Sequence, residues 1–319
     1  MAGRAPAPAP RRARVSTALT SLVRWFDSWA GAEAVREGDR SIDWLRVVPF
    51  LLLHASVGFV LVVGWSPVAL AVAAAWYALR MFAITAFYHR YFSHRAFRTS
   101  RAVQFLFALL GSSAVQRGPL WWAAHHRRHH RHSDEAPDAH SPEVDGFWWS
   151  HVGWLLAREN YRTRIEEVRD LARFPELCFL DRFDALVPLA SIAAFYALGT
   201  ALEHLAPGLG TDGPQMLVWG FVVSTVALYH CTFAINSIAH RFGSQPYETR
   251  DQSRNNALLA LLTLGEGWHN NHHRYPGAAR QGFRRRELDL SWYGLRVLAA
   301  LGLVWDLHPV PARVRAERR

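Results

Sequence analysis

Four apolar segments constrain the fold of this chain more than any other feature of its sequence. They cover residues 47–63, 67–88, 185–202 and 216–235, and only Arg80 interrupts them with a charge. Each has about the 17 to 25 residues that a membrane-spanning helix needs. The alternative, a pair of buried helical hairpins in a soluble protein, is disfavoured by four such runs paired by short turns. We predict an all-α membrane protein with four transmembrane helices in two hairpins.

The placement of basic residues predicts the orientation of these helices. All 36 basic residues are Arg, and the net charge is +10. The two short connections, residues 64–66 and 203–214, contain no Arg, whereas residues 1–46 contain 8, residues 89–184 contain 14 and the part after His240 contains 13. Because basic loops stay inside, we expect both termini on the cytoplasmic side of a multi-pass inner-membrane protein. We assign this charge to membrane lipid rather than to nucleic acid.

The remaining segments divide the chain into three parts. Residues 1–40 are basic and expected to be disordered, residues 41–308 form the membrane domain, and residues 309–319 form a basic tail. No apolar stretch of signal-peptide type follows the first residues, and the two cysteines suggest no disulfide framework. Within the domain we expect an interfacial helix, a solvated helix, and a second interfacial or core helix, at residues 102–115, 163–171 and 288–303.

Histidines gather in three short motifs on the predicted cytoplasmic side, the first at the end of the second apolar segment. The motifs read HRYFSH, HRRHH and HNNHH. In the second and third motifs, spacings of three and four residues place the rings on one face of a helix. The eight histidines of the motifs are His89, His94, His126, His129, His130, His269, His272 and His273.

The chemistry of imidazole indicates what these motifs hold. Neutral imidazole binds iron, zinc, copper and nickel, and eight clustered rings exceed the needs of one ion. Two metal ions are therefore the simplest interpretation. The HExxH motif of zinc hydrolases is absent, and the soluble carboxylate di-iron proteins need two ExxH motifs, of which only Glu266 to His269 is found. The sequence thus predicts a histidine-rich dimetal site in a cytoplasmic helical cap.

Longer stretches around the motifs carry a specific resemblance. They read ITAFYHRYFSHRAF, HRRHHRHSDEAPDAH with GFWWSHVGWLL, NSIAHRFG, and GEGWHNNHHRYP. Together they reach from Ile84 to Pro276, and they resemble the stearoyl-CoA desaturase-like integral-membrane fatty acyl desaturases. The resemblance implies that Asn236 and His240 of NSIAHRFG complete the metal site, with Asn236 acting through water.

The resemblance also implies an activity. Two iron ions would activate O2, and two hydrogens would leave adjacent carbons of a saturated acyl chain to give a cis double bond, expected at position 9. The expected substrate would be an acyl-CoA, with an acyl-lipid as the alternative. No fused haem domain with a His-Pro-Gly-Gly signature is present in the sequence. We therefore expect an external electron donor, a separate ferredoxin-like or similar protein.

Several other polar residues near the motifs have candidate roles. Asp134, Asp138 and Glu266 are expected to accept hydrogen bonds from the outer nitrogens of ligand rings. Arg127 and Arg128, with Arg131 nearby, are candidates for binding the phosphates of CoA or a phospholipid. Arg80 lies either within the membrane or near its cytoplasmic surface. Tryptophans near the motifs line an acyl tunnel or, equally, sit at the membrane interface; they are Trp121, Trp122, Trp148, Trp149, Trp154 and Trp268.

The other histidines do not match ligand positions. We expect His125, His132, His140 and His151 to contact ligand residues or to lie at the surface, and His54 and His230 inside the apolar segments to make helix contacts. Two rival functions stay open. An alkane or lipid hydroxylase has similar histidine motifs, although NSIAHRFG and GEGWHNNHH favour desaturation. A membrane metal transporter would need ligands near the membrane midplane rather than at the helix ends.

Overall fold

The computed structural model of the chain describes residues 17–32 and 35–319. It is mostly helical, and four helices are long and apolar enough to cross a membrane. They match the four apolar segments of the sequence, and the second extends five residues past the predicted end to include the first histidine of the HRYFSH motif. Their bounds are Trp44–Val63, Pro67–Ser93, Leu186–Leu205 and Gly213–Ser237.

These helices are composed of shorter pieces that follow one another directly. The first contains α2, the 3₁₀ turn η2 and α3, and the second contains α4 and the π-helical η3. The third is α11 alone, and the fourth contains α12, the π-helical η8 and α13. Their bounds are α2 Trp44–Ala55, η2 Ser56–Phe59, α3 Val60–Val63, α4 Pro67–Phe82, η3 Ala83–Ser93, α11 Leu186–Leu205, α12 Gly213–Met216, η8 Leu217–Val223 and α13 Ser224–Ser237.

Local sequence signals set where these helices begin. Ser66 accepts a hydrogen bond from the backbone N–H of Ala69, and Pro67 occupies the first turn of α4. Asp43 and Asp212 cap α2 and α12 in the same way, through the N–H of residues three positions later. A side-chain oxygen at the N-cap satisfies an N–H that has no partner within the helix, so these three long helices start at defined residues, whereas Ala185 gives α11 no such cap.

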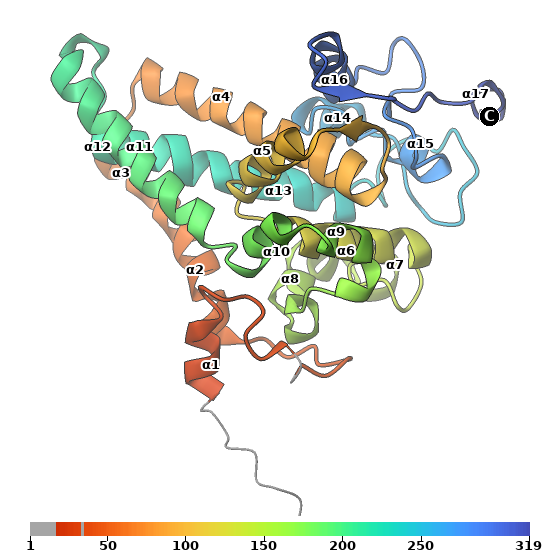
Figure 1. Ribbon diagram of the computed structural model, residues 1–319, viewed down its shortest axis with the longest axis horizontal. Helices are drawn as coiled ribbons and strands as arrows, with labels where there is room; N and C mark the ends of the chain where they lie inside the picture. The colour runs from red at the N-terminus through yellow and green to blue at the C-terminus, as the bar shows by residue number, and fades with distance from the viewer. Residues whose placement is uncertain (1–16, 33–34) are drawn as a thin grey trace, which may run out of the picture.

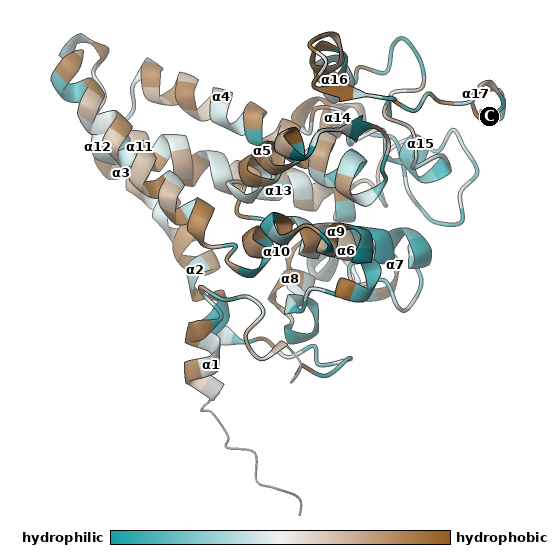
Figure 2. Cartoon of the chain, in the orientation of Figure 1, coloured by the Kyte–Doolittle hydropathy of each residue, from teal (hydrophilic) through white to brown (hydrophobic). Residues whose placement is uncertain are grey.

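The long helices form one part of the molecule, and the shorter helices pack at one end of them (Figure 1). Hydrophobic residues cover α2, α3, α4 and α11, whereas α6, α7 and α15 are largely hydrophilic (Figure 2). Only 11% of the apolar window of Trp44–Val63 is buried within the protein, against 61% for Gly213–Ser237. The first helix therefore offers most of its surface to lipid, while the fourth lies among its neighbours.

The shorter elements lie in four stretches of the described chain. The helix α1 precedes the first long helix, η7 lies between the third and fourth, and the others fall between the second and third or after the fourth. Two short strands, β1 and β2, pair antiparallel with Arg98 opposite Trp305. Up to the third long helix the bounds are α1 Thr17–Val23, β1 Arg98–Thr99, α5 Arg101–Ser112, α6 Pro119–His132, α7 Pro142–Asp145, η4 Trp149–Gly153, α8 Trp154–Leu156, η5 Arg158–Tyr161, η6 Ile165–Glu167, α9 Arg169–Ala172 and α10 Pro175–Arg182. After it they are η7 Pro207–Leu209, α14 Ala257–Leu262, α15 His269–Arg274, α16 Leu290–Ala300, β2 Val304–Trp305 and α17 Ala312–Ala316.

Two sequence expectations about local structure differ from what is found. Residues 163–171 form η6 and α9 rather than one helix, because Val168 adopts φ −135° between them. Disorder was expected through residue 40, but Thr17–Val23 is helical, Ser21 donates a hydrogen bond to Asp43, and the N–H of Ser28 bonds the carbonyl of Arg182. Residues 1–16 of that segment lie outside the described residues.

Arg80 is buried between the long helices rather than placed at the surface. Its side chain is fully shielded from solvent, and its guanidinium donates to the hydroxyls of Ser224 and Thr225 on α13 at 2.6 and 2.7 Å. A third bond reaches the carbonyl of Ser113 at 3.1 Å. The buried cation is held by neutral oxygen acceptors that join α4 to α13, and its depth in the membrane stays a prediction.

Candidate metal centre

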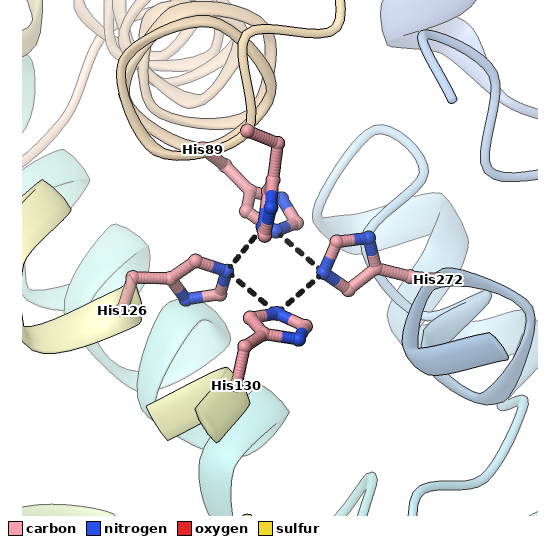
Figure 3. A group of neighbouring side chains, drawn as sticks. His89, His126, His130 and His272 are labelled. Carbon is pink, nitrogen blue, oxygen red and sulfur yellow. Dashed lines mark hydrogen bonds between the residues drawn. The ribbon is translucent and has the colours of Figure 1, made fainter. Parts of the chain in front are cut away.

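Five histidines from all three motifs face one point. The Nε2 atoms of His89 and His272 lie 3.0 Å apart, those of His94 and His126 lie 2.8 Å apart, and His130 lies within 3.0 Å of both His126 and His272. Figure 3 shows four of these rings directed at a shared centre. We call this set the five-histidine group; its members are His89, His94, His126, His130 and His272.

Four further histidines form a second group. His240 follows the end of α13, and its Nε2 lies 3.0 Å from Nε2 of His269 on α15. The ligand atoms of this set all lie within 4.8 Å of one another. We call it the four-histidine group; its members are His129, His240, His269 and His273.

Helix geometry explains how one motif serves both groups. Successive residues of an α-helix turn by about 100°, so positions i and i+4 point about 40° apart while i+3 points about 60° to the other side. On α6, His126 and His130 belong to the five-histidine group and His129 to the other. On α15 the roles are reversed, with His269 and His273 in the four-histidine group. The expectation that all rings of a motif share one helix face was therefore only partly right, because the rings of each motif divide between the two groups.

Carboxylates accept hydrogen bonds from the outer Nδ1 atoms of several rings. Asp138 lies 2.9 Å from His129, and Asp134 lies 3.0 Å from His240. Glu266 pairs with His89. All three acidic residues were expected in such positions. A carboxylate fixes the orientation of a ligand ring and increases the basicity of its other nitrogen.

Asp251 is a fourth such carboxylate, and sequence reasoning missed it. Its Oδ2 lies 2.6 Å from Nδ1 of His273. Asp251 lies in the loop before α14, far in sequence from the histidine motifs, and no spacing rule links it to them. With Asp251 included, three of the four rings in the four-histidine group have a carboxylate partner.

A buried ion-pair network positions Glu266. Arg90, only 1% exposed, pairs with both Asp289 and Glu266, while Gln281 lies 3.2 Å from Nδ1 of His89. Gly265 adopts φ +131°, and a Cβ atom there would lie 2.4 Å from Asp289. Glycine is required at this turn, because any side chain would collide with the carboxylate that holds Arg90.

Burial keeps most of these rings neutral. It lowers the pKa values of His126, His130, His269 and His272 well below the ordinary value of 6.5, with further lowering by neighbouring histidines. For His273, burial outweighs the opposing effect of Asp251 and lowers the pKa to about 4. Burial also disfavours the charged form of His129, but Asp138 overcomes it and raises the pKa. Neutral rings offer lone pairs, the form that a metal requires.

The residues present fit two metal ions. Nε2 of His273 is buried without a hydrogen-bond partner among the described residues, although a polar atom in that position normally has one. Nine Nδ1 or Nε2 atoms converge in two compact sets. Donor sets made only of imidazole suit iron, zinc, copper or nickel rather than magnesium or calcium.

An apolar cavity of about 420 Å³ reaches the metal centre. Side chains of α2, α11 and α13 line much of it, among them Asn236. Trp122 and His126, a member of the five-histidine group, line it as well. The cavity has the size and apolar lining of a small-molecule site.

Comparison with known proteins identifies the family. The fatty acid desaturase family model matches residues 63–301. The chain belongs to the fatty acid desaturase family. It is 36% identical over 270 residues to an sn-1 stearoyl-lipid 9-desaturase of Anabaena variabilis, covering 83% of this chain and 94% of the relative. It is 33% identical over 300 residues to an acyl-CoA 5-desaturase of Anemone leveillei, covering 89% and 88%.

A third relative extends the range of substrates in these names. The chain is 34% identical over 283 residues to an sn-2 palmitoyl-lipid 9-desaturase of Nostoc sp., covering 86% of this chain and 93% of the relative. The named relatives act on acyl-lipids or on acyl-CoA, and at position 9 or 5. Family membership therefore supports an oxidoreductase that desaturates fatty acyl chains and leaves the carrier open.

The tryptophans of this desaturase family member divide into three that line the cavity and three that do not. Trp121, Trp122 and Trp154 line the cavity. The other three do not border it: Trp148 is 77% exposed, and the indole N–H groups of Trp149 and Trp268 donate to backbone carbonyls. Proximity to a histidine motif in sequence therefore did not predict which tryptophans reach the acyl site.

Asn236 and His125 lie at the cavity rather than in either histidine group. Asn236 is half-buried and borders the same wall as His126. His125 is 4% exposed, and neither of its ring nitrogens has a hydrogen-bond partner in the described part of the chain. Burial lowers the pKa of His125 to about 3, so the ring is neutral. A surface position for His125 is thus wrong.

The other non-ligand histidines have structural contacts. His140 is buried against Asp138 and lies beside His129, whereas His132 is partly exposed near Glu135. The ring of His151 bonds the hydroxyl of Ser237 and contacts His230 on α13 at 3.1 Å. His54 packs edge-on against His230, as expected for a helix contact.

The arginines of the second motif are tied to the protein. Arg127 donates to Asp170 at 2.7 and 3.0 Å and to the carbonyls of Phe92, Ser93 and Glu167. All five of its N–H groups are used, so the proposed binding of a phosphate by Arg127 is wrong. Arg131 pairs with Glu167, and only Arg128 of the three makes no ion pair in the described residues.

Proposed function

We propose that this protein is an O2-dependent di-iron desaturase that introduces a cis double bond at position 9 of a saturated fatty acyl chain. The reaction consumes O2, two electrons and two protons, and releases two waters as two hydrogens leave the chain. The observation that carries the proposal is the apolar cavity that ends beside His126, one of the five-histidine group. Such a cavity would bring an unreactive chain next to a place where a metal ion would be held.

The nine histidines would hold the two ions, five around one and four around the other. Bound iron would supply the O2-activating chemistry that unactivated methylene groups require. The four-histidine group has fewer protein ligands, and we propose that Asn236 supports a water molecule there. Asp134, Asp138, Asp251 and Glu266 would keep the ligand rings oriented through their outer nitrogens.

The cavity would determine which carbons react. A methylene group has no acidic proton and no polar handle, so selection depends on holding the chain at a fixed position. Trp122 stacks on His126 with ring centroids 5.0 Å apart. Gln116 donates to Thr232 at 3.0 Å beside it, which joins the segment before α6 to α13 at the cavity wall. These contacts would make the wall rigid where the chain passes the metal centre.

We further propose that the four helices cross the cell membrane as two hairpins, with the histidine-bearing helices as a cytoplasmic cap. The distribution of Arg supports this orientation. The electron donor would be a separate ferredoxin-like protein. A polar cleft of about 670 Å³ borders both His130 and His273, and therefore one member of each histidine group. This cleft is a candidate route for electrons and protons, separate from the apolar cavity.

Expression in cells that lack an aerobic desaturase tests the proposal. Mass spectrometry of total fatty acids should show new monounsaturated chains with the wild type and none with His269→Ala. The position of the double bond gives the regiochemistry. Hydroxylated chains in place of unsaturated ones would contradict desaturation. If cells show no product, purified protein with ferrous iron and an artificial reductant must yield unsaturated chains, or the proposal fails.

A further inference from the structure

One wall of the apolar cavity is polar, and many of its hydrogen-bonding atoms lack partners. We call it the polar wall. Buried side-chain atoms without a hydrogen-bond partner in the described part of the chain include Nη2 of Arg46 and the hydroxyl of Tyr161. Both ring nitrogens of His125 also lack a partner there. All three residues line the cavity. Buried polar atoms normally find partners, so this concentration indicates a missing ligand.

The side chains of the polar wall contact one another. The guanidinium of Arg46 lies 4.0 Å above the ring of Tyr161, and that of Arg117 lies 5.9 Å from the same ring. Arg117 also donates to the carbonyl of Tyr161 at 3.0 Å. Trp121 lies between Arg117 and His125, at 5.5 Å from the first and 4.5 Å from the second. The unpartnered atoms thus belong to one continuous surface.

The charge of this wall is positive. Arg24, Arg46 and Arg117 line the cavity, and Asp184 is the acidic residue among its lining side chains. Asp184 lies 3.3 Å from Nε of Arg117 and accepts a hydrogen bond from Ser28. The guanidinium of Arg24 donates to the carbonyls of Ala30 and Gly31. Arg46, 7% exposed, faces the cavity without a carboxylate partner among the described residues.

A methyl-ended hydrocarbon chain does not suit this wall. Methylene groups there would leave the Arg46 guanidinium buried and unpaired, at a cost of several kcal/mol in typical proteins. An anion with several acceptor oxygens would satisfy it instead. Phosphoryl oxygens match the donor geometry of arginine, and tyrosine and neutral histidine can donate to the same group.

We propose that the polar wall binds a phosphoryl group of the acyl carrier and so selects substrates with an anionic carrier. This inference rests on the proposed function, since it assigns the carrier end of the same acyl site. Two sources of that phosphoryl group fit the chemistry, the diphosphate of coenzyme A and the phosphodiester of a glycerophospholipid. Phe26, in the turn after α1, is an exposed apolar residue that lines the cavity, and exposed apolar residues of α1 precede it, so membrane lipid can approach the cavity here.

The test compares three substrates in purified, iron-loaded protein. They are stearoyl-CoA, distearoyl phosphatidate and a neutral stearoyl ester, assayed with wild type, Arg46→Gln and Arg117→Gln. Arg296→Gln, an exposed position on α16, is the matched control for loss of one charge. Loss of a charge-assisted bond should raise KM for the anionic substrate about tenfold or more, with little change in kcat and none for the neutral ester. The anionic substrate that responds identifies the carrier.

Binding measured without turnover separates this inference from the proposed function. Under anaerobic conditions, the same two anionic lipids should bind wild type and Arg296→Gln equally, and bind Arg46→Gln and Arg117→Gln about tenfold more weakly. This binding result is expected even if no desaturation is seen. A lack of desaturation would contradict only the proposed function. Equal KM values and equal affinities in all variants, or equal losses for neutral and anionic substrates, would overturn the inference.

Discussion

The two histidine groups differ in their surroundings more than in their ligands. The five-histidine group has one carboxylate partner, Glu266, which is shared with Arg90. The four-histidine group has three, Asp134, Asp138 and Asp251. The first group borders the apolar cavity through His126. The comparison suggests a division of roles, with one ion enclosed by ligands and the other less enclosed but held by strongly oriented rings.

The largest expected effect comes from removing one ligand from each group. His269→Ala leaves three histidines in its group, whereas His94→Ala leaves four in the other. We expect His269→Ala to lose one of two iron ions per chain and more than about 100-fold in activity, beyond the effect of losing an outer-shell partner. His94→Ala should keep both ions. Metal analysis by mass spectrometry measures this, and equal losses in the two variants would remove the distinction.

Substitutions of the carboxylates should distinguish the two histidine groups through smaller losses of metal affinity than removal of a ligand. Asp138→Asn and Asp251→Asn keep the shape of the side chain but remove its charge. Each should weaken metal binding about 10- to 100-fold, and the ion of the four-histidine group should leave first. Glu266→Gln is the matched change for the five-histidine group, and it should spare the other ion. Titration with a chelator follows the two losses, and release in the opposite order would contradict this assignment.

Removal of the metals should make stability depend on pH. The buried rings of His126, His130, His269 and His272 have pKa values well below 6.5, and that of His273 is about 4. An unfolded chain takes up protons at these rings as pH falls through 6.5, while the folded apoprotein does not. Stability of the apoprotein should therefore decrease from pH 7.5 to pH 5. Thermal unfolding in detergent measures it, and a flat or rising profile would contradict the burial of neutral rings.

The smallest effect concerns the cavity that borders the five-histidine group. Ile192 on α11 lines it, and Ile192→Trp adds volume far from the histidines in sequence. We expect iron content to stay at the wild-type level while preference shifts by about tenfold toward chains shorter by one or two methylene groups. Competition between stearoyl and palmitoyl substrates measures the ratio. An unchanged ratio with full activity would show that this part of the cavity does not hold the acyl chain.

The sequence predicted the long helices and the histidines because both depend on local spacing. The apolar runs matched the four spans, and His126, His129 and His130 stood out within one helix. Their division between two groups was not predicted, since it needs the rotation of α6 against α15. Asp251 and Arg90 carry no local signal, because their partners lie in other segments.

Tertiary contacts also reversed one local interpretation. Arg127 looked available for a phosphate, but it pairs with Asp170, a residue of another helix. The hydroxyls that hold Arg80 come from α13, and nothing in the sequence places them beside it. In both cases the fold provides the acceptors that allow the cation to be enclosed.

Mössbauer spectroscopy of protein reconstituted with ⁵⁷Fe under anaerobic conditions tests the central claim most directly. Two iron ions in unlike histidine groups should give two ferrous quadrupole doublets of equal area, at two irons per chain. In Asp251→Asn, only the doublet of the four-histidine group should change. One doublet at one iron per chain, or two irons in indistinguishable sites that Asp251→Asn alters together, would contradict the division of nine histidines into groups of five and four.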